Sequence, residues 1–148
     1  MLKNFINEII EEMTPISTKN NNSLLFSPSR DIRVYADRLQ LKRVLKNLIQ
    51  NAISYGEKGS PIKISIGEIP QYIVIKVKDF GAGISQTDID KIFNKYYSAA
   101  KKFRKIGTGL GLYLALQIIK GHGGELSVES EEGKFTEFTI KLPAIINM

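Results

Sequence analysis

The most constraining feature of the sequence is a central stretch in which an apolar run leads into one acid and two glycines. Residues 72–78 (Tyr-Ile-Val-Ile-Lys-Val-Lys) are rich in β-branched side chains, which favours a β-strand. Asp79 follows directly, and Gly81 and Gly83 follow the acid. A carboxylate at a strand end can accept a hydrogen bond from the exocyclic amine of a nucleotide base, and glycines let the backbone approach a flat ring. The same pattern is typical of an ordinary turn after a strand, so its function depends on the other motifs of the chain.

Hydrophobic periodicity in the first part of the chain predicts one helix and two short strands. Residues 2–13 place apolar side chains at helical spacing, and Pro15 is expected to end that helix. Residues 23–26 and 32–35 are predicted to be strands, because β-branched and aromatic side chains recur there.

A second helix carries two amide side chains that could bind a ligand. Asp37 suits its N-cap, and the helix is expected to run to Tyr55, before Gly56. Asn47 and Asn51 are four residues apart and therefore share one face. They are either a satisfied polar patch or ligands, and an amide oxygen suits a hard cation such as Mg²⁺. The apolar stripe of this helix consists of Leu41, Val44, Leu45, Leu48 and Ala52.

The remaining periodicity alternates between strands and helices, which predicts an α+β fold. We expect a two-layer sandwich with a mixed, mostly antiparallel sheet and helices packed on one face. Two hairpins are predicted: strands 62–66 and 72–77 around residues 68–71, and strands 125–129 and 135–142 closed by Pro143. A short helix is expected to begin at a cap of Ser85 or Thr87 and to reach about Phe93. A longer helix is expected over residues 108–120, with Gly121 as its stop.

Composition excludes several classes of site. The 148 residues suffice for one domain with a proper core, and no apolar run approaches the about 18–20 residues of a membrane span. The absence of cysteine excludes disulfides and thiolate chemistry. With a single histidine, His122, a histidine-based metal site is not expected, and we interpret His122 as a helix-end residue. The net charge of +6 favours anionic partners, either nucleic acid or a phosphate-bearing small molecule.

Three glycines predict a phosphate site at the start of the helix near residue 108. Gly107, Gly109 and Gly111 follow a basic loop over residues 94–106. Closely spaced glycines at a helix N-terminus expose backbone N–H groups, which bind phosphate together with the helix dipole. The alternative is a flexible hinge. The spacing differs from the dinucleotide-binding fingerprint, and no strand leads into it.

Two other motifs have simpler interpretations. Asp79-Phe80-Gly81 also occurs in protein kinases, but such a kinase needs a His-Arg-Asp loop, and the only histidine lies downstream. The aromatic cluster of Phe93, Tyr96 and Tyr97 suits core residues that anchor a loop better than a platform for stacked bases.

Taken in order, these stretches resemble the catalytic ATP-binding domain of sensor histidine kinases, in the superfamily that includes gyrase, MutL and heat-shock chaperone ATPases. Residues 45–55 resemble the N box of that family and residues 79–84 its first glycine box. Residues 92–97 resemble its F box and residues 107–112 its second glycine box. The residues that resemble its closing pattern are His122-Gly-Gly124 and Gly133-Lys-Phe135-Thr136.

The resemblance implies a site for ATP or ADP with Mg²⁺, lying between helices under a mobile lid of residues 94–106. Asn51 would bind Mg²⁺, and Asn47 would act beside the phosphates. Asp79 would bind the adenine amine, with Thr136 supporting the adenine end. Further nucleotide contacts would come from Tyr55, Gly81, Gly83, Ile84, Phe93, Gly107, Thr108, Gly109, Leu110 and Gly111. The cations expected to offset the charge of the transferred phosphoryl group are Lys101, Lys102, Arg104 and Lys105.

The implied reaction is transfer of the ATP γ-phosphoryl group to a histidine on a separate dimerisation domain, with a response regulator as an indirect partner. Residues 1–22 would be a linker or helix remnant of that upstream domain, and residues 23–148 the catalytic ATP-binding domain. The helix over 2–13 contains no histidine, so the chain should not label itself. We expect a cytoplasmic domain with no nucleic acid partner and no direct membrane contact, although the full-length kinase could be membrane-anchored.

Two departures from the family pattern leave alternatives open. Ser54 stands where the family usually has a basic residue or histidine, and Ser98 where it often has an arginine. These serines favour a degenerate nucleotide-binding or interaction module. A superfamily ATPase is the other alternative, but such enzymes carry a glutamate base where Asn47 stands, and an amide cannot take a proton. A basic DNA-binding protein is a more distant alternative, because the positive charge is concentrated in the expected lid.

Overall fold

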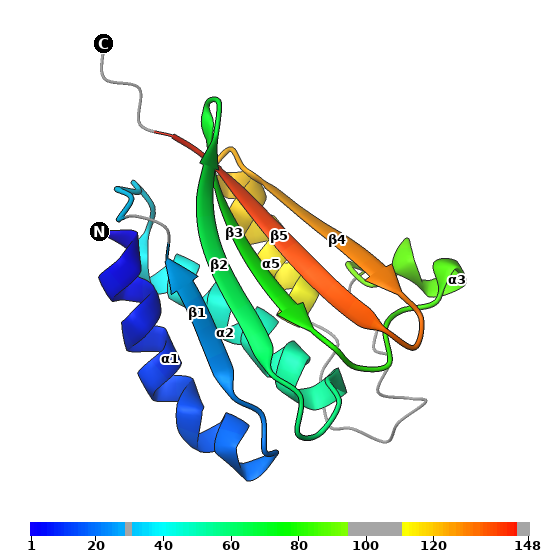
Figure 1. Cartoon of the computed structure of the whole chain (residues 1–148). Coiled ribbons are helices and arrows are strands. Elements are labelled where there is room, and N and C mark those ends of the chain that lie inside the picture. The colour runs from blue at the N-terminus through cyan, green and yellow to red at the C-terminus, as the bar shows by residue number, and fades with distance from the viewer. Residues whose placement is uncertain (29–30, 95–110, 145–148) are drawn as a thin grey trace.

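The computed structural model describes residues 1–28, 31–94 and 111–144 of the chain. Its elements, labelled as in Figure 1, are α1 (Leu2–Lys19), β1 (Leu24–Pro28), α2 (Arg38–Tyr55), β2 (Ile62–Ile69), β3 (Tyr72–Asp79), α3 (Gln86–Ile89), α5 (Gly111–Gly121), β4 (Glu125–Glu131) and β5 (Phe135–Pro143).

The strands form one mixed sheet in the order β1-β2-β3-β5-β4. β1 runs parallel to β2, and every other neighbouring pair is antiparallel. α2 and α5 lie behind the sheet, and α1 lies alongside β1 (Figure 1). The predicted two-layer α+β sandwich, with its two antiparallel hairpins, is confirmed. The strands β2, β3 and β4 are longer than the sequence indicated, so that Asp79 is the last residue of β3.

Alternate side chains of the strands enter the core on the face covered by helices. In β3, Ile73, Ile75 and Val77 are almost completely buried. The predicted stripe of α2 is buried as a whole, and the helix begins after Asp37, whose Oδ1 accepts a hydrogen bond from the Gln40 N–H at 3.0 Å. The apolar periodicity and the Asp37 cap therefore predicted this helix correctly. No helix in the described part of the chain is long and apolar enough to cross a membrane.

α1 continues through Pro15, so the expectation that this proline ends the helix is wrong. Proline removes one helical N–H donor, yet the helix extends to Lys19 because its apolar face packs on the core. Met13 and Ser17, on either side of the proline, are both buried. The origin of residues 1–22 as a remnant of an upstream domain stays a prediction; in the structure α1 shares the core of the sheet.

Residues 32–35 do not form a strand, contrary to the sequence prediction. Their segment instead satisfies the free N–H groups at the start of α1. The Leu2 N–H donates to the Ile32 carbonyl at 2.8 Å, and the Lys3 N–H donates to Asp31 Oδ1 at 3.1 Å. The first N–H groups of a helix lack partners within it, so a segment distant in sequence takes that role here.

The helix predicted from Ser85 to Phe93 is also shorter than expected. Only Gln86–Ile89 is helical, and the Ser85 hydroxyl bonds to the Thr87 hydroxyl rather than capping the helix. The following residues form turns, and these turns direct Ile92 into the core.

The continuity of α1 can be tested by replacing its proline. Pro15→Ala should raise the free energy of unfolding by about 2 kcal/mol, because proline in a helix interior is about 3 kcal/mol less favourable than alanine and the more flexible unfolded chain offsets part of the gain. Urea unfolding gives this value. Pro70→Ala, in the turn between β2 and β3, is the control and should lower stability by about 0.4–1 kcal/mol. A loss of stability in Pro15→Ala would contradict the continuous helix.

Candidate active site

Strand β3 ends at Asp79, whose carboxylate is buried. The residue is 5% exposed, and its Oδ1 accepts a hydrogen bond from the Gly81 N–H at 3.0 Å. Its Oδ2 accepts no hydrogen bond from any described residue, and no described cation forms an ion pair with it. Burial raises the pKa of Asp79 to about 6, although the hydrogen bond from Gly81 acts in the opposite direction. With this pKa the carboxyl is mostly ionised at pH 7, and its Oδ2 is an acceptor without a partner among the described residues.

Thr136 of β5 lies directly opposite Asp79 of β3 and is 6% exposed. Its hydroxyl lies 3.0 Å from the Ser130 hydroxyl of β4. The Ser130 hydroxyl also bonds to the Phe135 carbonyl at 2.7 Å and to the Ile84 N–H at 2.8 Å. The Asp79 carboxylate thus lies beside a network of two hydroxyl groups, of which that of Thr136 is buried and that of Ser130 is half-buried.

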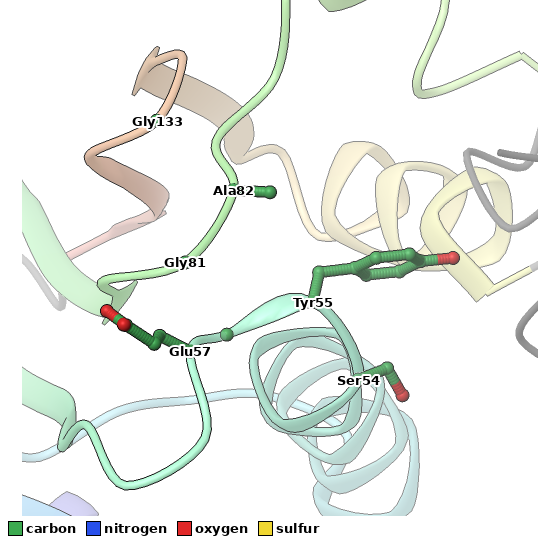
Figure 2. A pocket seen from close by; sticks show the side chains of 7 residues that line it. Ser54, Tyr55, Glu57, Gly81, Ala82 and Gly133 are labelled. Atoms are coloured by element: carbon green, nitrogen blue, oxygen red, sulfur yellow. The ribbon is translucent and has the colours of Figure 1, made fainter. Parts of the chain in front are cut away.

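The glycines after Asp79 are required by contacts within the protein. Figure 2 shows the segment of Gly81 and Ala82 between the end of α2 and the turn at Gly133. A Cβ on Gly81 would lie 2.1 Å from the Tyr55 carbonyl oxygen, and one on Gly83 would lie 2.3 Å from the Glu131 carbonyl oxygen. Gly83 also has a φ of +69°, a conformation that favours glycine. The physical reason for these glycines is therefore close backbone packing; contact with a base stays a prediction.

Backbone hydrogen bonds hold this segment from both sides. The Gly133 N–H donates to the Ala82 carbonyl at 2.7 Å, and the Ala82 N–H donates to the Tyr55 carbonyl at 3.4 Å. Three parts of the chain that are distant in sequence therefore determine where the segment lies.

A cleft of about 410 Å³ adjoins the same segment (Figure 2). Ser54 lies on its wall, with its hydroxyl 3.2 Å from Gln50 Nε2. Neither Asp79 nor Thr136 lines this cleft, so it borders the buried acceptors without containing them. Its lining residues are Ser54, Tyr55, Gly56, Glu57, Gly81, Ala82 and Gly133.

The two amides of α2 have different surroundings. Asn47 Nδ2 donates to the Gly111 carbonyl at 3.2 Å and so connects α2 with the first residue of α5. Asn51 is half-buried one turn later, and its side chain makes no hydrogen bond to a described residue. The Asn51 amide oxygen is therefore available to a cation. No group of three or more His, Cys, Asp or Glu side chains in the described residues could hold a metal, so a Mg²⁺ ion would depend on this amide, phosphate oxygens and water.

Phe93 packs edge-to-face on Phe138 of β5, with ring centroids 6.2 Å apart and planes inclined by 79°. This contact supports the interpretation of Phe93 as a core anchor. Ile84 is half-buried against the same core. The remaining predicted nucleotide contacts and cations lie outside the described residues: Lys101, Lys102, Arg104, Lys105, Gly107, Thr108, Gly109 and Leu110; so do Tyr96, Tyr97 and Ser98.

His122 connects the C-terminal end of α5 with the start of α2. Its Nε2 lies 3.0 Å from the Asp37 backbone nitrogen, and its Nδ1 lies 2.8 Å from the Ile118 carbonyl. Because a backbone N–H can only donate, Nε2 accepts and Nδ1 carries the proton. The interpretation of His122 as a helix-end residue is confirmed.

Sequence reasoning missed Ser130. In β4, Leu126 and Val128 face the helices, so alternation places Ser130 on the same face at the end of the strand. A serine at a core-facing position of a strand is a sequence signal for a polar network at that strand end.

The raised pKa of Asp79 predicts a pH-dependent cost of folding. The folded protein holds this proton more tightly than the unfolded chain, whose ordinary pKa is 3.8. The cost is absent below about pH 4, grows towards about pH 6 and then stays constant at about 3 kcal/mol. Asp79→Asn cannot ionise and should therefore exceed the wild type in stability at pH 8 and match it near pH 4.

Urea unfolding of both proteins from pH 4 to pH 8 measures this difference. Asp90→Asn is the control, because Asp90 is exposed and its replacement should leave the pH dependence unchanged. A constant difference between Asp79→Asn and the wild type over this range would show that the Asp79 carboxyl titrates normally.

Comparison with known proteins identifies the family of the chain. Residues 36–146 match the family described as histidine kinase-, DNA gyrase B- and HSP90-like ATPase. The sensor histidine kinase WalK of Bacillus subtilis is 36% identical over 143 residues, which are 94% of this chain and 23% of that protein. Sporulation kinase C of the same organism is 37% identical over 144 residues, which are 93% of this chain and 33% of that protein.

One solved structure shares the fold over almost the whole length of both chains. The catalytic domain of histidine kinase ThkA superposes with a TM-score of 0.84 and 31% identity, covering 97% of this chain and 94% of that domain. The chain spans a third or less of the two Bacillus kinases, and the matched family implies ATP binding. The family match and the shared fold show that the chain belongs to the histidine kinase-, DNA gyrase B- and HSP90-like ATPase family, as a catalytic domain of the sensor histidine kinase type.

Proposed function

We propose that this domain binds ATP with Mg²⁺ and transfers the γ-phosphoryl group to a histidine on a separate dimerisation domain. The observation that carries the proposal is the buried Asp79 carboxylate, which has no cationic partner in the described part of the chain. A buried charge without a partner is costly, and such groups cluster at functional sites. An exocyclic adenine amine would give Asp79 Oδ2 the donor that the described residues do not supply.

The proposed phosphate end of the site depends on α2 and the start of α5. Asn51 would hold Mg²⁺ through its amide oxygen, and the glycines before α5 would bind phosphate through their N–H groups. When bound, Mg²⁺ supplies positive charge that offsets the phosphate oxygens. Because Ser98 stands where the family often has an arginine, we assign the remaining charge compensation to Lys101, Lys102, Arg104 and Lys105.

Asn47 supports transfer over hydrolysis. Its amide N–H₂ is a donor to the Gly111 carbonyl, and an amide cannot accept a proton from water at neutral pH. The hydrogen bond of Asn47 to Gly111 connects α2 with α5, and we propose that this contact positions the phosphate end of the site.

The proposed acceptor is a histidine outside this chain. The related Bacillus kinases are three or more times longer than the matched segment, which leaves room for other domains. We propose that the partner is the histidine-containing dimerisation domain of the same kinase, and that a response regulator then receives the phosphoryl group.

Asn51→Ala should remove the magnesium dependence of nucleotide binding. The wild type should bind ATP more tightly with Mg²⁺ than with EDTA, by roughly tenfold if one ligand contributes a typical charge-assisted contact. In Asn51→Ala the two affinities should be nearly equal. Isothermal titration calorimetry measures both.

Asn7→Ala is the matched control, because Asn7 is an exposed amide on α1. It should keep the wild-type magnesium dependence. An undiminished magnesium effect in Asn51→Ala would remove this residue from the metal site.

Phosphoryl transfer is tested with γ-labelled ATP and a separately supplied acceptor domain from the same kinase. The label should appear on the acceptor histidine and not on this chain. Replacing the four lid cations with glutamine should slow transfer at least tenfold while ADP affinity stays nearly constant, since these charges are assigned to the γ-phosphate. Normal ADP binding without any labelling of the acceptor would instead support a degenerate nucleotide-binding module.

A further inference from the structure

The hydrogen bonds of the Ser130 hydroxyl determine where its proton points. Its oxygen has three neighbours within hydrogen-bond distance: the Ile84 backbone nitrogen at 2.8 Å, the Phe135 carbonyl oxygen at 2.7 Å and the Thr136 hydroxyl at 3.0 Å. A serine hydroxyl has one proton and two lone pairs, which matches three neighbours.

Two of these neighbours can act in only one way. The Ile84 N–H can only donate, so Ser130 accepts from it. The Phe135 carbonyl can only accept, so Ser130 gives it the single proton. The third contact must then run from the Thr136 hydroxyl to Ser130, because Ser130 has no second proton. The single proton of the Thr136 hydroxyl is therefore donated to the Ser130 oxygen.

With this assignment, the side chains of Asp79 and Thr136 can offer a ligand only hydrogen-bond acceptors. Thr136 faces Asp79 in the strand register, at the distance of directly opposed side chains. Asp79, when ionised, has no proton to donate, and its Oδ1 is already bonded to Gly81. A ligand group that contacts these two buried side chains must therefore bring its own hydrogens.

We propose that Ser130 is a specificity-determining residue that makes this site select a base with an exocyclic amine over one with a carbonyl. The inference rests on the proposed nucleotide site and adds the reason for its choice of base. An amine carries two N–H groups and can satisfy lone pairs of both Asp79 and Thr136. A carbonyl oxygen at the same position would face only lone pairs, and a site built for hydrogen bonds rejects such a mismatch strongly.

Removing the Ser130 hydroxyl should relax this selection. In Ser130→Ala the Thr136 hydroxyl proton is released, so it can rotate and donate to a carbonyl. Ser130 does not need to touch the base for this effect; it acts through Thr136. Ser130→Thr retains a hydroxyl at the same position and should retain the selection.

The test compares the affinities of ADP and inosine diphosphate, which carries a carbonyl in place of the adenine amine. Calorimetry is performed at pH 8, where Asp79 is ionised because its pKa is about 6. The wild type should prefer ADP. In Ser130→Ala the ratio of the two affinities should fall about tenfold, the effect of one hydrogen bond, while Ser130→Thr should keep the wild-type ratio.

Ser127→Ala is the matched control, because Ser127 lies on the same strand but is exposed on the opposite face. It should leave the ratio unchanged. If Ser130→Ala does not fold, Ser130→Cys serves as the second variant, because a thiol is a weak donor and acceptor and should shift the ratio in the same direction.

The outcomes separate this inference from the proposed function. If Ser130→Ala weakens both nucleotides equally, Ser130 is only structural and the inference is overturned, whereas ADP binding by the wild type still supports the proposed function. If the wild type binds neither nucleotide, the proposed function and the inference both fail. Loss of selection in Ser130→Ala with retention in Ser130→Thr is the supporting result.

Discussion

The whole structure depends on the burial of one strand, β3, between two antiparallel neighbours and beneath the helices. Ile75 and Val77 of this strand are 0% and 1% exposed, and removal of such apolar surface from water is the dominant favourable term in folding. The same burial continues to Asp79 and raises its pKa. The stability of the core and the chemistry of the site therefore have one physical cause.

Close packing around Gly81 and Gly83 fixes the position of the loop after β3. The end of α2 lies against one glycine and the β4–β5 turn against the other, and neither position leaves room for a side chain. Backbone hydrogen bonds through Ala82 add to the same contact. A loop held in this way offers its buried acceptors in a fixed arrangement, which a precise binding site requires.

α5 is attached to α2 at both of its ends. Asn47 binds the carbonyl of Gly111 at the start of α5, and His122 at the other end accepts from the backbone of Asp37. The apolar face of α5 lies between these bonds, with Ile119 completely buried. These contacts determine where the proposed phosphate-binding end of α5 lies relative to Asn51.

Local sequence patterns correctly predicted the elements whose causes are local: α2 with its Asp37 cap, the two hairpins, and the place of Asp79 at the end of a buried strand. They failed where distant contacts decide. α1 passes Pro15 because its face is buried, and Asp31 and Ile32 bind the start of that helix while residues 32–35 form no strand. Only the tertiary structure shows which proton Ser130 accepts, because the Ile84 N–H that completes its three contacts reaches the β4–β5 hairpin only in the folded chain.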